Sequence, residues 1–294
     1  MSADHPFVSV IIPVFNDMDR LSACLAKLEH QTYPADQFEV IVVDNGSASD
    51  PAPLVEGFAH ARCFKEDQPG SYAARNRGIR EARGDVFAFT DADCLPPTDW
   101  IGAGVNALLE SPDCGLIAGR IDVFCTPGAA PGAVELYDSV RGLNQKHYVS
   151  DQGFGATANV FTWRKVVDAV GPFDTELKSC GDMEWGRRVG RKGYTVTYCD
   201  LAAIAHPARK TLGELSGKMR RVAGGMHTLS RKSARSAGGG VRVDLLLRDV
   251  KEVLNDNRLR RSRDRAKVLA VAFYVESVKI AERLRLLFGG KPLR

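Results

Sequence analysis

The sequence predicts an α/β protein whose central sheet is mostly parallel and covered by helices. Continuous apolar runs rich in β-branched residues, such as Phe7–Phe15 and Phe38–Val43, are typical of strands buried on both faces. Segments with apolar residues at helical spacing separate these runs, so strand and helix patterns alternate through the first hundred residues. A chain of 294 residues is long enough to bury a sizeable core.

The expected elements of this first part follow one another in a regular order. A strand over Phe7–Phe15 precedes a helix over Asp17–His30, in which Leu21, Leu25 and Leu28 are spaced for one buried face. The next elements are a strand at Phe38–Val43, a short helix at Asp50–Ala59, a weaker strand at Arg62–Lys65, a helix at Ser71–Ala82 and a strand at Val86–Thr90. In such sheets, ligands bind beyond the carboxyl ends of the strands.

The middle of the chain is less regular. Strand patterns occur at Gly115–Phe124 and Tyr194–Cys199, and helix patterns at Pro131–Gly142 and Asp182–Lys192. Between them, Gly153–Phe161 is glycine-rich and small, as the wall of an active site would be.

The charge distribution divides the chain after His206. Residues 1–206 carry 18 Lys and Arg against 28 Asp and Glu, whereas residues 207–294 carry 22 against 8. The basic part is dense at Arg258–Lys267, directly before an amphipathic helical pattern over Val268–Phe288. This helix could pack on the first part of the chain or on a second copy of the chain, or lie on an anionic membrane surface. Nucleic acid is disfavoured because no binding module is recognisable and aromatic residues are sparse there.

The cysteines and the apolar segments bear on the compartment. Seven scattered cysteines contain no CxxC pair, which argues against zinc knuckles and redox pairs and favours reduced thiols. The first apolar run lacks a preceding basic region, and no stretch approaches the roughly 20 apolar residues needed to span a bilayer. We expect a cytoplasmic protein, with peripheral attachment to the cytoplasmic face of a membrane as an open alternative.

Polar clusters follow three of the predicted elements. Asp91-Ala92-Asp93 could hold Mg²⁺ or Mn²⁺, which would in turn bridge a diphosphate. Asp44 could accept a hydrogen bond from a base N–H, and Arg75 offers forked donors from the helix beginning at Ser71. Taken alone, each cluster is also compatible with an ordinary turn or a solvated helix face.

Together these clusters resemble the family 2 glycosyltransferases of the GT-A fold. The resemblance covers roughly residues 6–206 and rests on seven ordered blocks. The blocks are VSVIIPVFND (Val8–Asp17), EVIVVDNGSASD (Glu39–Asp50), SYAARNRGI (Ser71–Ile79), GDVFAFTDADC (Gly84–Cys94), GATANVF (Gly155–Phe161), VGPFDTEL (Val170–Leu177) and CGDMEWGRR (Cys180–Arg188). The resemblance implies a Rossmann-like, mostly parallel mixed sheet flanked by helices in a catalytic domain at residues 1–206. About 1–115 would bind the nucleotide sugar and 116–206 the acceptor, with 207–294 a basic helical extension.

The resemblance also implies roles on the donor side. Asp44 would contact the base, usually uracil in this family, and Arg75 would join it there. Asp93 would ligate Mg²⁺ or Mn²⁺, Asp91 would meet the ribose or the metal, and His206 lies where some relatives place a further metal ligand. The full set expected at the nucleotide sugar is Pro13, Val14, Phe15, Asp44, Arg75, Asp91, Ala92 and Asp93.

On the acceptor side, Asp182 matches the catalytic carboxylate of the family. Relatives often carry an acid directly before it, where this chain has Gly181. The residues expected to bind the acceptor are Asn159, Glu184 and Trp185. For Glu184, an ion pair with Arg187 or Arg188 is an open alternative, and for Trp185, packing in the core.

The resemblance implies an inverting glycosyltransferase that moves a sugar from a nucleoside diphosphate donor, usually UDP, to a hydroxyl group. The acceptor would be a glycan or lipid-linked saccharide in bacterial-type polysaccharide or glycoconjugate synthesis. One alternative is a sugar-1-phosphate nucleotidylyltransferase, although Pro13-Val14-Phe15-Asn16 stands where such enzymes need a basic glycine-rich loop. Another is a non-catalytic scaffold that binds nucleotide sugars, against which the intact Asp91, Asp93 and Asp182 argue.

Overall fold

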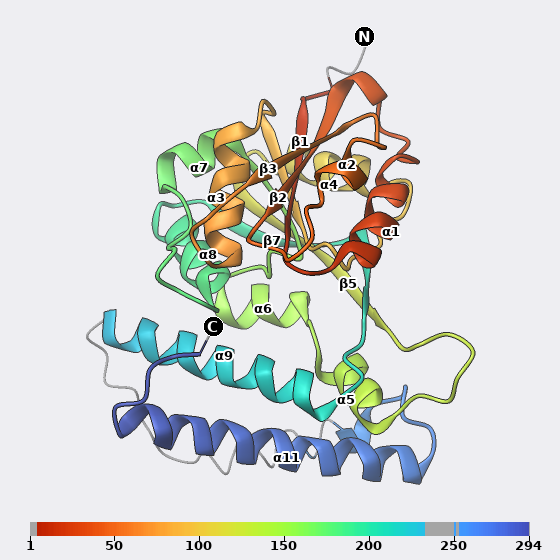
Figure 1. Cartoon of the computed structure of the whole chain (residues 1–294), viewed down its shortest axis with the longest axis vertical. Helices are drawn as coiled ribbons and strands as arrows, with labels where there is room; N and C mark the ends of the chain where they lie inside the picture. Colours follow the sequence, from red (N-terminus) through yellow and green to blue (C-terminus); the bar gives the residue numbers. More distant parts are fainter. Residues whose placement is uncertain (1–4, 233–249, 251–252, 294) are drawn as a thin grey trace. The chain divides into compact units, whose positions relative to one another are not determined.

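A computed structural model describes residues 5–232, 250 and 253–293 of the chain (Figure 1). The chain forms two compact units. The first contains residues 5–122, 144–176 and 181–206, and the second contains residues 123–143, 177–180 and those after His206. The segment 123–143, which the sequence places in the acceptor half of the catalytic domain, therefore packs within the second unit.

A seven-stranded sheet forms the centre of the first unit (Figure 1). Its strands lie in the order β3-β2-β1-β4-β6-β5-β7. They are β1 (Val8–Val14), β2 (Phe38–Asp44), β3 (Ala61–Lys65), β4 (Val86–Thr90), β5 (Cys114–Phe124), β6 (Asn159–Trp163) and β7 (Thr195–Pro207). The first four pair in parallel, and β6 is antiparallel to both β4 and β5. The predicted mixed and mostly parallel sheet is confirmed.

Helices cover both faces of this sheet. Cross-strand partners share a face, so the register places Ile11, Phe89 and Val160 on one face and Phe161 on the other. Helix α3 (Ser71–Glu81) approaches the first face so closely that a Cβ added to its Gly78 would lie 2.5 Å from Ile11 Cγ2. Helix α4 (Trp100–Leu109) approaches the second, where a Cβ on its Gly104 would lie 2.3 Å from Phe161 Cζ.

The first unit contains further helices. They are α1 (Met18–Leu28), the 3₁₀ turn η1 (Ala35–Gln37), α2 (Ala52–Val55), α6 (Gln145–Gln152), α7 (Arg164–Val170) and α8 (Gly181–Arg191). The sequence does not predict α4, α6, α7 or β6. The strand predicted at Tyr194–Cys199 is too short, since β7 continues to Pro207.

A buried carboxylate fixes the amino ends of the parallel strands. Glu39 of β2 is 2% exposed and accepts hydrogen bonds from Ser9 Oγ (2.8 Å), Arg83 N (2.8 Å) and Arg62 Nη2 (2.6 Å). Burial alone would raise the pKa of Glu39, but these donors outweigh it, so the pKa lies below its usual value. These hydrogen bonds tie the amino ends of β1, β2 and β3 to the turn before β4.

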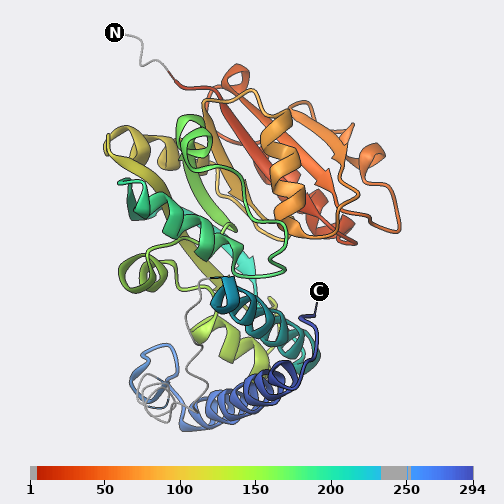
Figure 2. The same ribbon diagram turned by 90° about the vertical axis from the view of Figure 1, so that its left-hand side faces the viewer.

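The second unit is helical and has its own core. It contains α5 (Ala133–Arg141), α9 (Leu212–Lys232) and α11 (Ser262–Leu287), with α9 and α11 side by side (Figure 2). Its core consists of Val134, Tyr137, Leu215, Val253, Leu259, Val268, Val271, Ala272 and Val275. Within the described residues, none of the helices combines the length and the apolar content that crossing a bilayer requires.

Candidate active site

Polar side chains gather where β1, β2 and β4 end. The parallel register pairs Val14 with Asp44, the last residue of β2. Asp44 is 2% exposed, and its Oδ1 accepts the N–H of Ser47 at 3.0 Å. Its Oδ2 is buried and has no hydrogen-bond partner among the residues that the structure describes. A buried carboxylate oxygen of this kind can accept a hydrogen bond from a ligand N–H.

The segment that follows β1 lies beside the loop that follows β2. Pro13 is half-buried and Val14 is buried, whereas Phe15 is 53% exposed. Asn16 adopts a left-handed conformation, with φ of 52°. Its N–H donates to Ser47 Oγ (2.9 Å), and its side-chain oxygen accepts the N–H of Ala48 (2.8 Å). The segment directly after Phe15 is therefore held against the loop that follows Asp44.

Asn45 organises the backbone before α3. Its amide donates to the carbonyl oxygens of Glu66 (3.0 Å) and Gln68 (2.8 Å) and accepts the N–H of Gly70 (2.6 Å). Gly70, with φ of 129°, immediately precedes the helix. Because the Asn45 amide makes three contacts within the protein, this side chain positions the beginning of α3.

Arg75 of α3 is the buried cation of the site. It is 3% exposed, and its Nη2 donates to Asp91 Oδ1. Its Nε is buried without a hydrogen-bond partner among the described residues. The sequence predicts Arg75 beside the base with Asp44, whereas the structure gives it an ion pair with Asp91, which follows β4 on the other side of β1.

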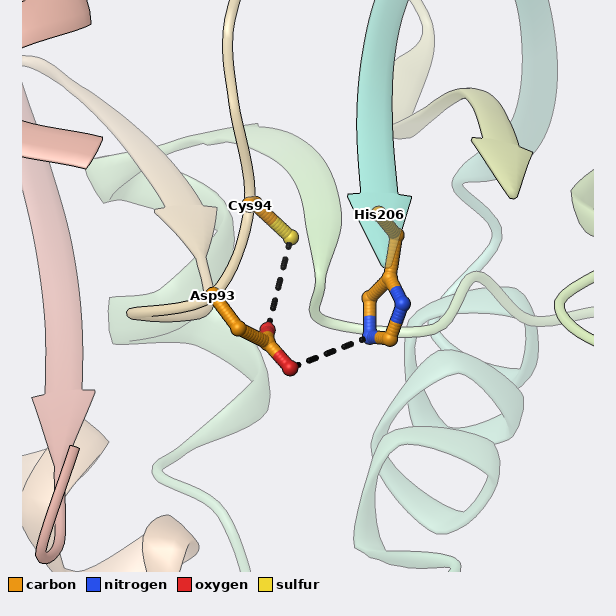
Figure 3. A group of neighbouring side chains, drawn as sticks. All are labelled: Asp93, Cys94 and His206. Atoms are coloured by element: carbon orange, nitrogen blue, oxygen red, sulfur yellow. Dashed lines mark hydrogen bonds and ion pairs between the residues drawn. The ribbon is translucent and has the colours of Figure 1, made fainter. Parts of the chain in front are cut away.

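The turn after β4 meets the end of β7 (Figure 3). Backbone hydrogen bonds in both directions join Leu95 to Ala205, at 2.8 Å and 3.2 Å. This bridge brings His206 Nε2 to 3.6 Å from Asp93 Oδ2, while Cys94 Sγ lies 4.0 Å from Asp93 Oδ1. One potential ligand atom from each of the three residues lies within 4.8 Å of the others. Ala92, between the two aspartates, is buried.

The residues of this turn fit a hard divalent cation. Burial, with Asp91 nearby, raises the pKa of Asp93 above its usual value even though His206 and Arg20 act in the opposite direction. Burial, with Asp91 and Asp93 nearby, also raises the pKa of the Cys94 thiol well above its usual value. Carboxylate oxygen suits Mn²⁺ and Mg²⁺, whereas a thiol suits softer metals. Asp93 and His206 would therefore hold the ion, with Asp91 next to it.

Asp182 lies in the first turn of α8 and is half-buried. Its Oδ1 accepts the hydroxyl of Tyr72 (3.3 Å) and the N–H of Met183 (2.9 Å). The Tyr72 oxygen itself accepts the N–H groups of Gly181 (2.9 Å) and Asp182 (3.3 Å). Burial raises the pKa of Asp182, and its donors together with Arg75 offset only part of the rise. Sequence reasoning missed Tyr72, although its spacing of three residues from Arg75 places both on one face of α3.

Two of the predicted acceptor-binding residues are corrected by the structure. Asn159 is fully buried: its amide oxygen accepts from Trp100 Nε1 (2.9 Å), and its nitrogen donates to the carbonyl oxygens of Arg120 (2.8 Å) and Ala202 (2.7 Å). Trp185 is 1% exposed and donates to the Gly171 carbonyl at 2.9 Å. Both side chains are occupied in the interior and are not available to an acceptor.

Glu184 of α8 is half-buried and forms an ion pair with Arg188 of the same helix. Its carboxylate oxygens lie 2.8 and 2.9 Å from Arg188 Nε. Arg188 also donates to the carbonyl oxygens of Val170 and Pro172, both at 2.7 Å. Of the two roles considered for Glu184, acceptor binding and a structural ion pair, the structure contains the ion pair, with Arg188 as the partner.

Comparison with known proteins gives consistent matches. The model of glycosyl transferase family 2 matches residues 9–165. The glycosyltransferase AglE of Haloferax volcanii is 38% identical over 230 residues, covering 76% of this chain and 74% of that protein. A dolichyl N-acetyl-α-D-glucosaminyl phosphate 3-β-D-2,3-diacetamido-2,3-dideoxy-β-D-glucuronosyltransferase of Methanococcus voltae is 21% identical over 201 residues, covering 64% and 63%.

Among solved structures, the chain is similar to a mannosyltransferase of Pyrobaculum calidifontis in complex with GDP-mannose and Mn²⁺. The TM-score is 0.59 at 18% sequence identity, and the match covers 97% of this chain and 75% of that one. A likeness at this identity concerns the fold, and it confirms the expected GT-A architecture.

We predict that Mn²⁺ binding, measured by electron paramagnetic resonance with saturating UDP, depends on Asp93 and His206 and not on Cys94. Asp93→Asn and His206→Ala are expected to weaken Mn²⁺ binding by roughly tenfold or more, because each removes a direct ligand. Cys94→Ser, the matched change in the same turn, is expected to leave it unaltered. An equal loss in the serine variant would point instead to a site for a soft metal.

Proposed function

The chain belongs to glycosyltransferase family 2 and is a glycosyltransferase (EC 2.4), and from this premise we propose how its site acts. We propose that it transfers a sugar from a UDP-sugar to an acceptor hydroxyl with inversion at the anomeric carbon. The observation that carries the proposal is the position of Arg75, which pairs with Asp91 of the candidate metal turn and also lowers the pKa of Asp182. A donor-binding group and a candidate base thus share one buried cation.

The proposed preference for UDP rests on Asp44. With Oδ1 bonded to Ser47, only Oδ2 of this carboxylate is left without a partner among the described residues. Uracil presents a single ring N–H, which one acceptor oxygen satisfies. Guanine presents two adjacent N–H groups and would engage both carboxylate oxygens. Pro13, Val14 and Phe15 would line the same pocket.

The proposed metal site uses Asp93 and His206, with Asp91 adjacent. When bound, Mn²⁺ or Mg²⁺ there would neutralise the charge that develops on the departing diphosphate. Asp91 also neutralises Arg75, so the turn has both a cation-binding residue and a residue that fixes α3.

Asp182 is proposed as the base that takes the proton of the acceptor hydroxyl. As that oxygen bonds to the anomeric carbon, the bond from this carbon to the diphosphate oxygen breaks, and the electron pair leaves with UDP. A single displacement of this kind inverts the configuration. The raised pKa of Asp182 suits a general base, because a stronger base takes a proton more readily.

The alternatives receive less support from the same residues. A sugar-1-phosphate nucleotidylyltransferase would need a basic glycine-rich loop after β1, where this chain has Pro13-Val14-Phe15-Asn16. A scaffold that only binds nucleotide sugars would have no need of a half-buried carboxylate with a raised pKa at Asp182.

The proposed acceptor is a glycan or lipid-linked saccharide in polysaccharide or glycoconjugate synthesis. The Methanococcus voltae relative, whose name specifies a dolichyl phosphate-linked sugar, supports a lipid-linked acceptor. Acceptors of that kind reside at membranes, which agrees with the proposal that the protein acts at a cytoplasmic membrane surface.

We propose that α11 lies on an anionic membrane surface. Phe273, Leu284 and Leu287 are 53%, 50% and 64% exposed, and their spacing places them on one face of the helix. Phe288, at the end of the helix, is 89% exposed. Residues 207–294 carry 22 basic against 8 acidic residues, which matches the charge of anionic lipid.

The double variant Leu284→Ser/Leu287→Ser is expected to weaken binding to phosphatidylglycerol vesicles by about tenfold or more, because two apolar side chains are lost from the buried face. Leu201→Ser, an exposed position 78% accessible in β7, serves as the control in vesicle cosedimentation. If the protein is a dimer in solution and the double variant dissociates, the membrane proposal is contradicted. The exposed apolar face of α11 would then pack against a second copy of the chain.

The preference for UDP is tested by hydrolysis. With Mn²⁺ and water as acceptor, the wild type is expected to hydrolyse a UDP-sugar with a higher kcat/KM than the GDP-sugar bearing the same glycosyl group.

Substitution of the proposed base tests the mechanism. Asp182→Asn is expected to lower the hydrolysis of the UDP-sugar by about a hundredfold or more while the affinity for UDP is kept. Asp168→Asn, an exposed acid on α7, is the matched control. Undiminished hydrolysis in Asp182→Asn would remove this residue from the role of base.

The pH profile gives an independent check on Asp182. The Tyr72 hydroxyl lowers the pKa of Asp182 by donating to its carboxylate, so Tyr72→Phe should raise that pKa further. A base acts only when deprotonated, so the acid limb of the kcat/KM profile is expected to move to higher pH. Well above that limb, the two enzymes should converge. A limb that stays in place or moves to lower pH would contradict this assignment.

A further inference from the structure

A group of cations in the second unit surrounds one buried carboxylate. Asp138 of α5 has a side chain that is 3% exposed. Arg209 Nη1 lies 3.0 and 3.2 Å from its two oxygens, and the Arg209 N–H donates to it at 3.0 Å. Lys218 Nζ of α9 lies 3.8 Å from the same carboxylate. We name Arg209, Lys218 and Arg221, the residue one turn after Lys218, the basic cluster.

The basic cluster is short of negative charge. In the described part of the chain, Asp138 is the single carboxylate within 4.0 Å of these cations, and Arg221 pairs with none. Lys279 of α11 also acts on Lys218, but its own charge is balanced by Glu276 at 2.5 Å. Two of the three positive charges in the basic cluster are therefore uncompensated.

This arrangement weakens the charged state of its own members. Burial, with Arg209, Arg221 and Lys279 adding to it and Asp138 opposing it, lowers the pKa of Lys218 to about 8. Burial and Arg209 likewise lower the pKa of Arg221. Like charges held together out of water cost folding stability, so an arrangement that places them there without partners suits a bound anion.

We propose that the basic cluster binds a phosphate or diphosphate group. Arg221 offers a guanidinium fork that has no carboxylate partner among the described residues, and Lys218 offers an ammonium group, while Arg209 is held on Asp138. The two charges left uncompensated among the described residues match a phosphate dianion better than a single carboxylate. The Lys218 side chain is 17% exposed and that of Arg209 is 23% exposed, so both are mostly buried but keep part of their surface in contact with solvent.

The anion belongs to the acceptor, and this part of the inference rests on the function proposed above. A lipid-linked saccharide carries a phosphate or diphosphate between its lipid and its first sugar. In the sequence, Arg209 follows the candidate metal ligand His206 by three residues. The basic cluster would then select acceptors by the charged group next to the saccharide.

Binding is tested on the full chain with farnesyl diphosphate, farnesol, inorganic phosphate and phosphatidylglycerol vesicles. The buffer contains EDTA, so that no divalent cation holds a diphosphate in the donor site. Lys218→Met and Arg221→Met are each expected to weaken farnesyl diphosphate binding at least tenfold. Arg231→Met, which removes an exposed charge from the same helix, is the matched control. UDP affinity with Mn²⁺ should be equal in all variants.

The probes separate the sources of the phosphate. Binding of farnesyl diphosphate that exceeds that of inorganic phosphate, with farnesol unbound, supports the acceptor. If inorganic phosphate binds as tightly as farnesyl diphosphate, the acceptor role is overturned. If the variants lose affinity only for the vesicles, the acceptor role is also overturned, and the anion is a lipid headgroup. Unchanged affinity for every probe in both variants overturns the anion site itself.

Folding is controlled by the melting temperature and by a conservative variant. Lys218→Met removes a buried like charge while Arg209 still pairs with Asp138, so its melting temperature should equal or exceed that of the wild type. Lys218→Arg, which keeps the charge, is expected to retain anion binding. A cluster with a purely structural role would give the opposite pattern, with a lower melting temperature and unaltered binding.

Discussion

One buried cation determines the arrangement of the first unit. The Arg75 guanidinium is 3% exposed, and a charge removed from water to this degree must be balanced. Asp91, in the turn after β4, forms a direct ion pair with Arg75. The positive charge of Arg75 also lowers the pKa of Asp182 at the beginning of α8. Helix α3, the candidate metal turn and the candidate base are thereby held in one electrostatic unit, because loss of either acid would leave Arg75 undercompensated.

Uncharged polar side chains complete this positioning. Asn45 holds the loop before α3, and the Tyr72 hydroxyl receives two N–H groups from the beginning of α8. Asn76 exchanges hydrogen bonds of 2.8 and 2.9 Å with the backbone of Phe173, which ties α3 to the segment before α8. None of these three is a candidate for the chemistry. Their amides and hydroxyl fix the loop before α3, the segment before α8 and the beginning of α8, which carries Asp182.

The sequence predicts well whatever depends on local pattern. Strands β1, β2 and β4 match their apolar runs within a residue at each end, and parallel pairing necessarily brings Asp44 and Asp91 to one edge. It fails where the outcome depends on distant partners. Asn159 is a polar residue in a glycine-rich segment. It becomes a core residue because its amide forms hydrogen bonds with Trp100, Arg120 and Ala202, which are distant in the sequence. The same holds for β7, which continues past the charged Asp200 as far as Pro207 and is bridged to Leu95 through Ala205.

Both units contain side chains whose charges the protein does not balance alone, and the signs are opposite. In the first unit, the raised pKa of Asp93 reflects burial and the neighbouring Asp91, which His206 and Arg20 relieve only in part. In the second, the lowered pKa of Lys218 reflects burial among cations that Asp138 relieves only in part. A cation improves the first site and an anion the second. Under the proposed function, a divalent cation would relieve the deficit in the first unit and the phosphate group of an acceptor the deficit in the second, so each ligand would stabilise the unit that binds it.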